Sequence, residues 1–159
     1  MAVQPVPEGY HTVTPYLAVD DASAAIDFYE RAFGAKERVR MLGPDGKIGH
    51  AELEIGDSHV MLSDPFPQFT PRPPKELGGT SVGVFVYVDN VDELVQQAVD
   101  AGATLMMEPD DMFWGDRFGS VMDPFGHSWQ IATHVEDVPP EEMAKRSEEW
   151  AAQMAGSRA

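Results

Sequence analysis

Residues 117–131 read RFGSVMDPFGHSWQI, and this stretch decides the fold. Its centre, Asp123-Pro-Phe-Gly126, predicts a turn, because proline presets φ at the second position and glycine accepts the positive φ that closes the turn. The runs on either side therefore read as a β-hairpin. In the second run Trp129 and Ile131 point to one face and Gln130 points to the other. The apolar face requires a covering helix, and the polar face can line a site.

The length, composition and charge predict a soluble chain with one core, built as one domain or as two half-size modules. The chain has 159 residues, of which 43% are hydrophobic, and a formal charge of −16. No apolar run approaches the roughly 20 residues of a transmembrane helix. The negative charge argues against nucleic acid and anionic membrane as partners, although a solvated acidic surface is its simpler explanation.

A cytoplasmic location is expected from two further features. Residues 1–11 contain neither the basic region nor the apolar region of a signal peptide. The chain has no cysteine, which excludes disulfides and thiolate chemistry and fits a reducing compartment.

The N-terminal part of the chain predicts one β-α-β-β-β module, at residues 13–64, after an extended lead-in at 1–12. A helix is expected from about residue 21 to residue 33, capped by Asp20 or Asp21 and ended by Gly34. Strands are expected at residues 14–19, 37–42, 48–55 and 59–63.

A linker and a second module follow. Residues 65–80 contain five prolines and two glycines, so no regular element is expected there. The pattern restarts at 81–136, with a helix capped by Asp89-Asn90 and ended by Gly102. Residues 137–159 predict a separate acidic helix. Strands of the second module are expected at 81–88, at 104–108 and in the two arms of the hairpin.

The two modules also match each other in sequence. Val19-Asp20-Asp21 corresponds to Val88-Asp89-Asn90, and Gly34-Ala35 corresponds to Gly102-Ala103. Each pair falls at the same point in the order of elements. This self-similarity indicates a duplicated unit.

Three segments resemble the vicinal oxygen chelate superfamily, which includes glyoxalase I, bleomycin-resistance proteins and extradiol dioxygenases. They are residues 17–34 (LAVDDASAAIDFYERAFG), 86–94 (VYVDNVDEL) and 123–130 (DPFGHSWQ). The subgroup most similar to them is that of the small glyoxalase-like proteins named after the phosphonate operon. The resemblance covers about residues 12–135. It implies an α+β fold in which two paired βαβββ modules form a U-shaped sheet, with helices outside and a ligand cavity inside.

Strand alternation agrees with this arrangement. Val84 and Val86 belong to an apolar face that fits under a helix, so Phe85 and Tyr87 face the cavity. The same reasoning turns Glu54 inward and Leu53 outward. The predicted cavity is lined by Tyr16, His50, Glu52, Glu54, Phe85, Tyr87, Arg117 and Gln130, with Trp114 at its mouth.

The resemblance also implies four positions for a metal ion, one on each of four strands. They fall on Thr14, on Glu52 or Glu54, on Gly83 and on Gln130. Glycine offers no side-chain donor and threonine is a poor one, whereas a divalent site collects three or more strong donors. No bound metal or other cofactor is therefore expected, and a shifted divalent site using His50 and Glu52 stays open.

Several of these residues have two interpretations. His50 and Glu52 are either an acid–base pair or a structural hydrogen-bonded pair. Arg117 either meets an anionic ligand or pairs with Glu52 or Glu54. Trp114 either stacks on a planar ligand or anchors its loop. The inward aromatic rings either face a ligand or fill the cavity.

Three functions follow from these alternatives. The first is a small-molecule binding protein of bleomycin-resistance type that holds a planar or aromatic compound. The second is a metal-dependent lyase or isomerase, or a dioxygenase-type enzyme, resembling glyoxalase I. The third is a metal-free enzyme that uses His50 and Glu52. The residues leave open whether the protein is an enzyme. A homodimer is expected, because the tail helix has an apolar stripe with Trp150.

Overall fold

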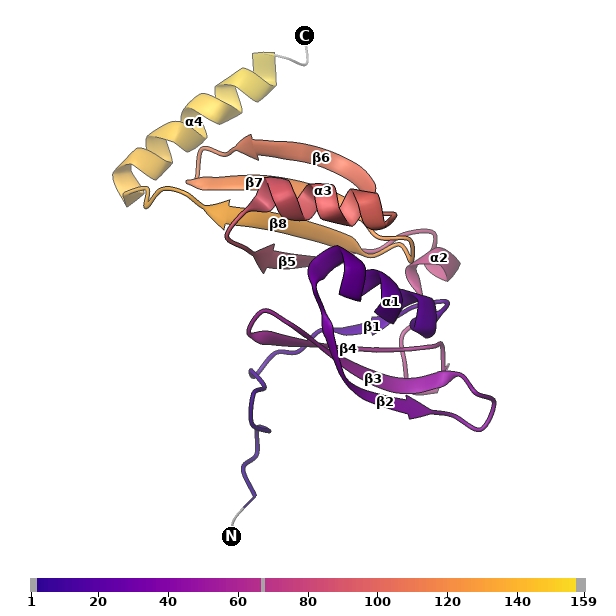
Figure 1. The fold of residues 1–159 in the computed structure, drawn as a ribbon. Helices are drawn as coiled ribbons and strands as arrows, with labels where there is room; N and C mark the ends of the chain where they lie inside the picture. The colour runs from indigo at the N-terminus through magenta and orange to yellow at the C-terminus, as the bar shows by residue number, and fades with distance from the viewer. Residues whose placement is uncertain (1–2, 67, 157–159) are drawn as a thin grey trace.

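The computed structural model describes residues 3–66 and 68–156, so the expectations for 1–2, 67 and 157–159 lie outside the described residues. Its strands form two four-stranded sheets, in the orders β1-β4-β3-β2 and β5-β8-β7-β6. Figure 1 shows the first sheet below and the second above, with α1 and α3 on the same side of both. The predicted α+β fold of two βαβββ modules is confirmed.

The element bounds are close to those expected from the sequence. The first module contains β1 (Tyr16–Ala18), α1 (Ala22–Phe33), β2 (Lys36–Leu42), β3 (Ile48–Ile55) and β4 (Ser58–Ser63). The second contains β5 (Gly83–Tyr87), α3 (Val91–Ala101), β6 (Thr104–Asp111), β7 (Asp116–Met122) and β8 (Ser128–His134). In each sheet the module's first strand pairs in parallel with its last, and the other pairs are antiparallel.

Local chemistry sets the helix ends. The side chain of Asp21 accepts a hydrogen bond from the amide of Ala24, so Asp21 is the cap of α1. The side chain of Asn90 does the same for the amide of Glu93 at the start of α3. Gly34 ends α1 at φ 64°, a left-handed conformation that glycine adopts without strain.

Two elements differ from expectation, and each contains a proline. The linker contains a short helix, α2 (Pro74–Leu77), which begins at a proline because the first helical position does not need its N–H. Strand β6 continues to Asp111, beyond the expected end at 108. Pro109 does not end it, because β6 is an edge strand with one side unpaired.

The two modules pack together through α1 and α3, and the strands β1 and β5 face each other across a seam. These are edge strands of the two sheets, so hydrogen bonding does not continue from one sheet to the other. In Figure 1, α1 lies beside this seam. The ring of Phe33, on α1, lies 4.3 Å from that of Trp129, on β8, and both side chains are buried. One hydrophobic core therefore joins both modules.

The buried carboxylate of Asp123 links side chains of the two modules within this core. Its Oδ2 accepts hydrogen bonds from the hydroxyl of Tyr29 (2.7 Å) and from Nε1 of Trp129 (2.9 Å). Its Oδ1 accepts from the backbone amides of Phe125 and His127, both at 2.9 Å, which closes the predicted turn. Burial and the neighbouring carboxylate raise the pKa of Tyr29 well above its ordinary value.

The C-terminal helix, α4 (Pro140–Gly156), lies along the end of the second sheet and has no buried residue. The ring of Trp150 lies 5.6 Å from that of Phe113, and Arg146 pairs with Glu136 at 2.8 Å. The homodimer stays a prediction, which light scattering of the purified protein can test. Within residues 3–66 and 68–156, no helix is long and apolar enough to cross a membrane.

Replacing Tyr29 by phenylalanine removes the donor to Asp123 and keeps the ring. We expect urea unfolding to show a loss of about 1.5–3 kcal/mol, the usual scale for a hydrogen bond to a charged group. Tyr16→Phe, which removes a hydroxyl on an exposed pair, is the matched control and should cost much less. Equal losses in the two variants would contradict the importance assigned to Asp123.

Candidate functional site

The face of the first sheet opposite α1 carries a chain of polar side chains. Nε2 of His50 donates to Oε1 of Glu52 at 3.0 Å, so Nδ1 is free to accept from the hydroxyl of Tyr16 at 3.2 Å. The hydroxyl of Tyr10 donates to the other oxygen of Glu52. His50, Glu52 and Tyr16, all predicted for the site, are therefore brought together on one face.

Tyr10 was missed by sequence reasoning, because the segment around it has no periodic pattern. Its ring stacks on that of His59, with the centroids 4.2 Å apart. The hydrogen bonds from Tyr10 and then from His50 lower the pKa of Glu52. Burial, followed by the bond to Glu52, raises the pKa of Tyr10 to about 12. Glu52 is thus held as a carboxylate.

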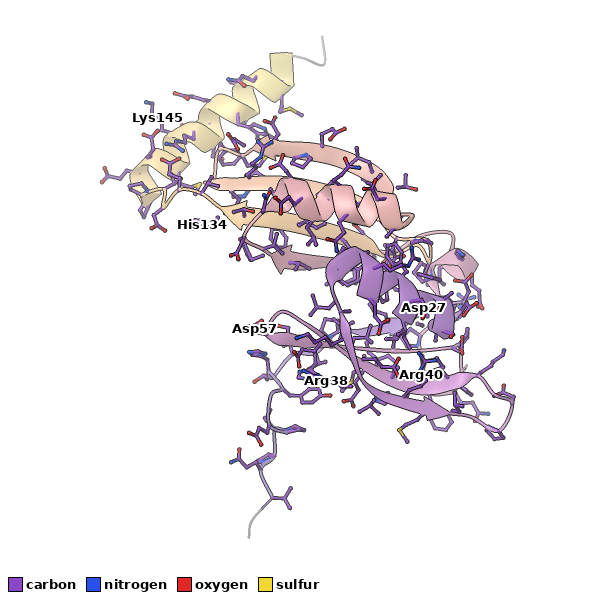
Figure 2. The ribbon with its side chains drawn as sticks, viewed as in Figure 1. Asp27, Arg38, Arg40, Asp57, His134 and Lys145 are labelled. Atoms are coloured by element: carbon purple, nitrogen blue, oxygen red, sulfur yellow. The ribbon has the colours of Figure 1, made fainter. Side chains whose placement is uncertain are left out.

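Glu54 is engaged elsewhere. It forms an ion pair with Arg38 of the neighbouring strand β2, with Nη2 and Oε2 2.6 Å apart. The hydrogen bond from Arg38 lowers the pKa of the Glu54 carboxyl. Figure 2 shows Arg38 on the first sheet, below the hairpin tip that carries Asp57. Glu54 is therefore available to a ligand only if this surface pair opens.

The inner face of the second sheet carries an aromatic cluster of four residues: Phe85, Tyr87, Trp114 and Phe118. The ring of Phe85 lies 5.0 Å from that of Tyr87 and 5.8 Å from that of Phe118. The ring of Phe118 lies 6.0 Å from that of Trp114. Phe118 was not among the predicted residues, although its position two residues after Asp116 on β7 gives it the same orientation.

Asp116 anchors this cluster and is only 3% exposed. Its Oδ2 accepts from the hydroxyl of Tyr87 (3.1 Å) and from Nε1 of Trp114 (3.0 Å). Its Oδ1 lies 2.8 Å from Nδ1 of His134, at the end of β8 in Figure 2. The hydrogen bond from Trp114 favours the interpretation that this residue anchors its loop. The hydrogen bond to Asp116, followed by that to Asp137, raises the pKa of His134.

The prediction that Arg117 faces the cavity is wrong. Val121 is fully buried under α3, and every second residue of β7 shares its face, so Arg117 lies on the helix side. Its Nε lies 2.6 Å from Oδ2 of Asp92, a residue of α3. The predicted salt bridge to Glu52 or Glu54 is replaced by pairs to Asp92 and Asp111.

Gln130 and Gly83 fit a packed pair better than a metal site. A Cβ atom added to Gly83 would lie 3.2 Å from Cδ of Gln130, so the amide of Gln130 fills the space that a ligating side chain would need. Among the described residues, no group of three or more His, Cys, Asp or Glu side chains could hold a metal ion. The donors implied by the resemblance therefore do not fit a divalent ion.

Two cavities lie along the seam between the modules, and Phe85 lines both. The larger, about 790 Å³, is called the hairpin-side cavity because the β3–β4 hairpin forms one wall, with Asp57 and His59. Tyr87 and Asp89 stand on the opposite wall. The smaller, about 700 Å³, is lined by β1, including Tyr16, and by the linker. The linings contain Phe85, Tyr87 and Tyr16 of the predicted set. The other predicted residues lie outside both linings: His50, Glu52, Glu54, Trp114, Arg117 and Gln130.

Known proteins resemble this chain along most of its length. The family profile described as the Glyoxalase/Bleomycin resistance protein/Dioxygenase superfamily matches residues 10–131. The uncharacterized protein Mb0911c of Mycobacterium bovis is 46% identical over 134 residues, covering 82% of this chain and 88% of the relative. TioX from Micromonospora sp. ML1 has a crystal structure that superposes with a TM-score of 0.63 and 30% identity, covering 79% of this chain and 99% of TioX.

A second solved structure bears on the fold alone. The PhnB protein from Bacillus cereus superposes with a TM-score of 0.58 at 17% identity, covering 77% of this chain and 99% of that protein. Its likeness supports the arrangement of the two modules and leaves the residues of the site to be interpreted from their own geometry.

Replacing Tyr10 by phenylalanine removes the largest cause of the lowered Glu52 pKa. We expect the pKa of Glu52 to rise toward its ordinary value, because the carboxylate loses a donor and the protonated form does not. The carboxyl carbon shift of Glu52, followed by NMR against pH, measures this. Tyr16→Phe is the control, since Tyr16 contacts His50 and not Glu52. An unchanged Glu52 pKa in Tyr10→Phe would contradict the assignment.

Proposed function

Because this chain belongs to the glyoxalase/bleomycin resistance protein/dioxygenase superfamily, we propose that it binds a small planar organic ligand between its two modules. The superfamily fold hosts many reactions, so membership alone leaves the ligand open. The residues along the seam supply the further argument. Assignment to the phosphonate-operon-type subgroup stays a prediction.

The observation that carries the proposal is the exposure of two aromatic rings at the seam. Phe85 is 44% exposed and Tyr87 is 62% exposed, and both belong to the edge strand β5, which lines the hairpin-side cavity with residues of both its faces. Aromatic rings prefer offset-stacked or edge-to-face partners, so exposed ring faces suit a planar molecule. A cavity of about 790 Å³ is within the range of ligand sites of drug-like size.

The fit to a ligand also has a polar component. The hydroxyl of Tyr87 is already held by Asp116, which fixes the orientation of its ring. Nδ1 of His59, on the opposite wall, is buried and has no hydrogen-bond partner among the described residues. A few oriented polar groups around apolar rings are typical of small-molecule sites.

Titration with N-phenyl-1-naphthylamine, a neutral aromatic dye, tests the proposal. We expect saturable binding at one site per chain, with weaker binding in Phe85→Ala by about 5–30-fold, which corresponds to the roughly 1–2 kcal/mol lost when a packed aromatic contact is removed. Dye fluorescence measures the affinity. Phe69→Ala is the matched control, because Phe69 is 86% exposed and lines neither cavity.

Two results would count against ligand binding at the seam. The first is the absence of saturable binding by the unmodified protein. The second is an equal affinity of the dye for Phe85→Ala and for the unmodified protein, since Phe85 lines both cavities.

A second candidate function is proton transfer at His50 and Glu52. The observation in its favour is the chain from Tyr16 through His50 to Glu52, because an imidazole between a hydroxyl and a carboxylate is oriented for general acid–base work. A metal-dependent lyase finds less support, since one of the positions implied for a metal ligand is Gly83. Proton transfer here needs no metal.

Deuterium uptake by hydroxyacetone in heavy water, followed by NMR, tests the second candidate. We expect the protein to accelerate uptake at the carbon beside the carbonyl, and His50→Gln to abolish the acceleration while leaving binding of the naphthylamine dye unchanged. Acceleration that survives His50→Gln, or none above buffer, would rule out proton transfer by His50.

A further inference from the structure

The charged side chains that line the hairpin-side cavity are mainly acidic. Apart from His59, its charged lining residues are Asp57 and Asp89, and its lining contains no lysine or arginine. Asp57 belongs to the turn between β3 and β4, and Asp89 follows β5 in the other module. Figure 2 shows Asp57 at the tip of the hairpin, on the side of the molecule where β5 ends. Each module therefore contributes one carboxylate to the cavity.

Within the part of the chain that the structure describes, neither carboxylate has a basic partner. None of the ion pairs within 4.0 Å among the described residues involves Asp57 or Asp89. Residues 81–136 contain seven aspartates and three glutamates against a single lysine or arginine, Arg117. Arg117 lies on the opposite face of its sheet, paired with Asp92. The cavity lining thus contains no lysine or arginine that could offset the negative potential of these carboxylates.

The aromatic rings that line the cavity also favour a cation over an anion. The face of an aromatic ring carries partial negative charge, so Phe85 and Tyr87 attract a cation placed over them. Two carboxylates near the same cavity act in the same direction, and low-dielectric walls focus their field. A planar anion would instead meet repulsion from every charged group in the lining except His59.

We propose that the ligand of the hairpin-side cavity is a planar aromatic cation. The proposal rests on the proposed function, because it names the class of ligand for the same seam. The rings of Phe85 and Tyr87 stack on the ligand, and Asp57 and Asp89 attract its charge from the two modules.

Three related probes test this at pH 8, where an ordinary histidine is neutral. N-methylacridinium is permanently cationic, acridine is neutral and acridine carboxylate is anionic, and all three share one ring system. At low salt we expect N-methylacridinium to bind about tenfold more tightly than acridine, and acridine carboxylate to bind most weakly. Added salt should reduce the preference for the cation and leave the affinity for acridine nearly constant.

Substitutions then test which residues cause the preference for the cation. Asp57→Asn combined with Asp89→Asn should bring the affinities for N-methylacridinium and acridine to within about twofold to threefold, while acridine binds as before. Glu108→Gln combined with Glu148→Gln is the matched control, because it removes the same charge from exposed positions outside the cavity lining. The control variant should keep the full preference.

The outcomes separate the two proposals. Equal binding of acridine and N-methylacridinium to the unmodified protein overturns the inference and leaves ligand binding at the seam intact. A preference that the control variant loses as fully as the cavity variant does also overturns it, because total charge would then be the cause. Failure of all three probes, together with failure of the naphthylamine dye, overturns both.

Discussion

The carboxylate of Asp123 is the interaction on which the rest of the structure depends. It is 4% exposed and accepts four hydrogen bonds, two from side chains and two from backbone amides. A buried carboxylate without such partners would be strongly unfavourable, so its position is fixed by the donors around it. One donor, Tyr29, belongs to the first module, and the other side-chain donor, Trp129, to the second. The same carboxylate therefore closes a hairpin turn and joins the two modules.

The link between the modules through Asp123 determines where the seam and its cavities lie. With α1 packed against Trp129, the edge strands β1 and β5 face each other without pairing, and side chains, not hydrogen bonds between sheets, define the space between them. His127, at the turn, donates from Nε2 to the carbonyl of Ala18 on β1 at 2.9 Å, which adds a second link across the seam. These links hold the two modules together, and the cavities between the modules stay open to a ligand that contacts both.

Sequence reasoning predicted most of the fold because local rules agreed with one another. The helix caps at Asp21 and Asn90, the turn at Asp123 and the alternation of β3 and β5 each point to the observed element. The first module's pair, His50 and Glu52, lies on the face of its sheet that alternation indicated, but it lines neither cavity. Alternation failed only for Arg117, whose orientation is set by the burial of Val121 on the same strand.

Other parts of the candidate site were beyond sequence reasoning. Tyr10 reaches Glu52 from a segment without periodicity, so no local pattern indicates its contact. The buried position of Asp116 depends on three donors that are distant from one another or lie in a loop. Contacts of this kind arise from tertiary packing, and a single sequence contains no signal for them.

The central claim is that both modules hold one ligand at their seam. Backbone amide shifts, recorded by NMR during titration with N-phenyl-1-naphthylamine, test it most directly. The account predicts that the largest changes fall in two places, on β5 and on the turn Gly56–Ser58, because these form opposite walls of the hairpin-side cavity. Changes confined to one module, or to the outer surfaces of α1 and α3, would contradict it.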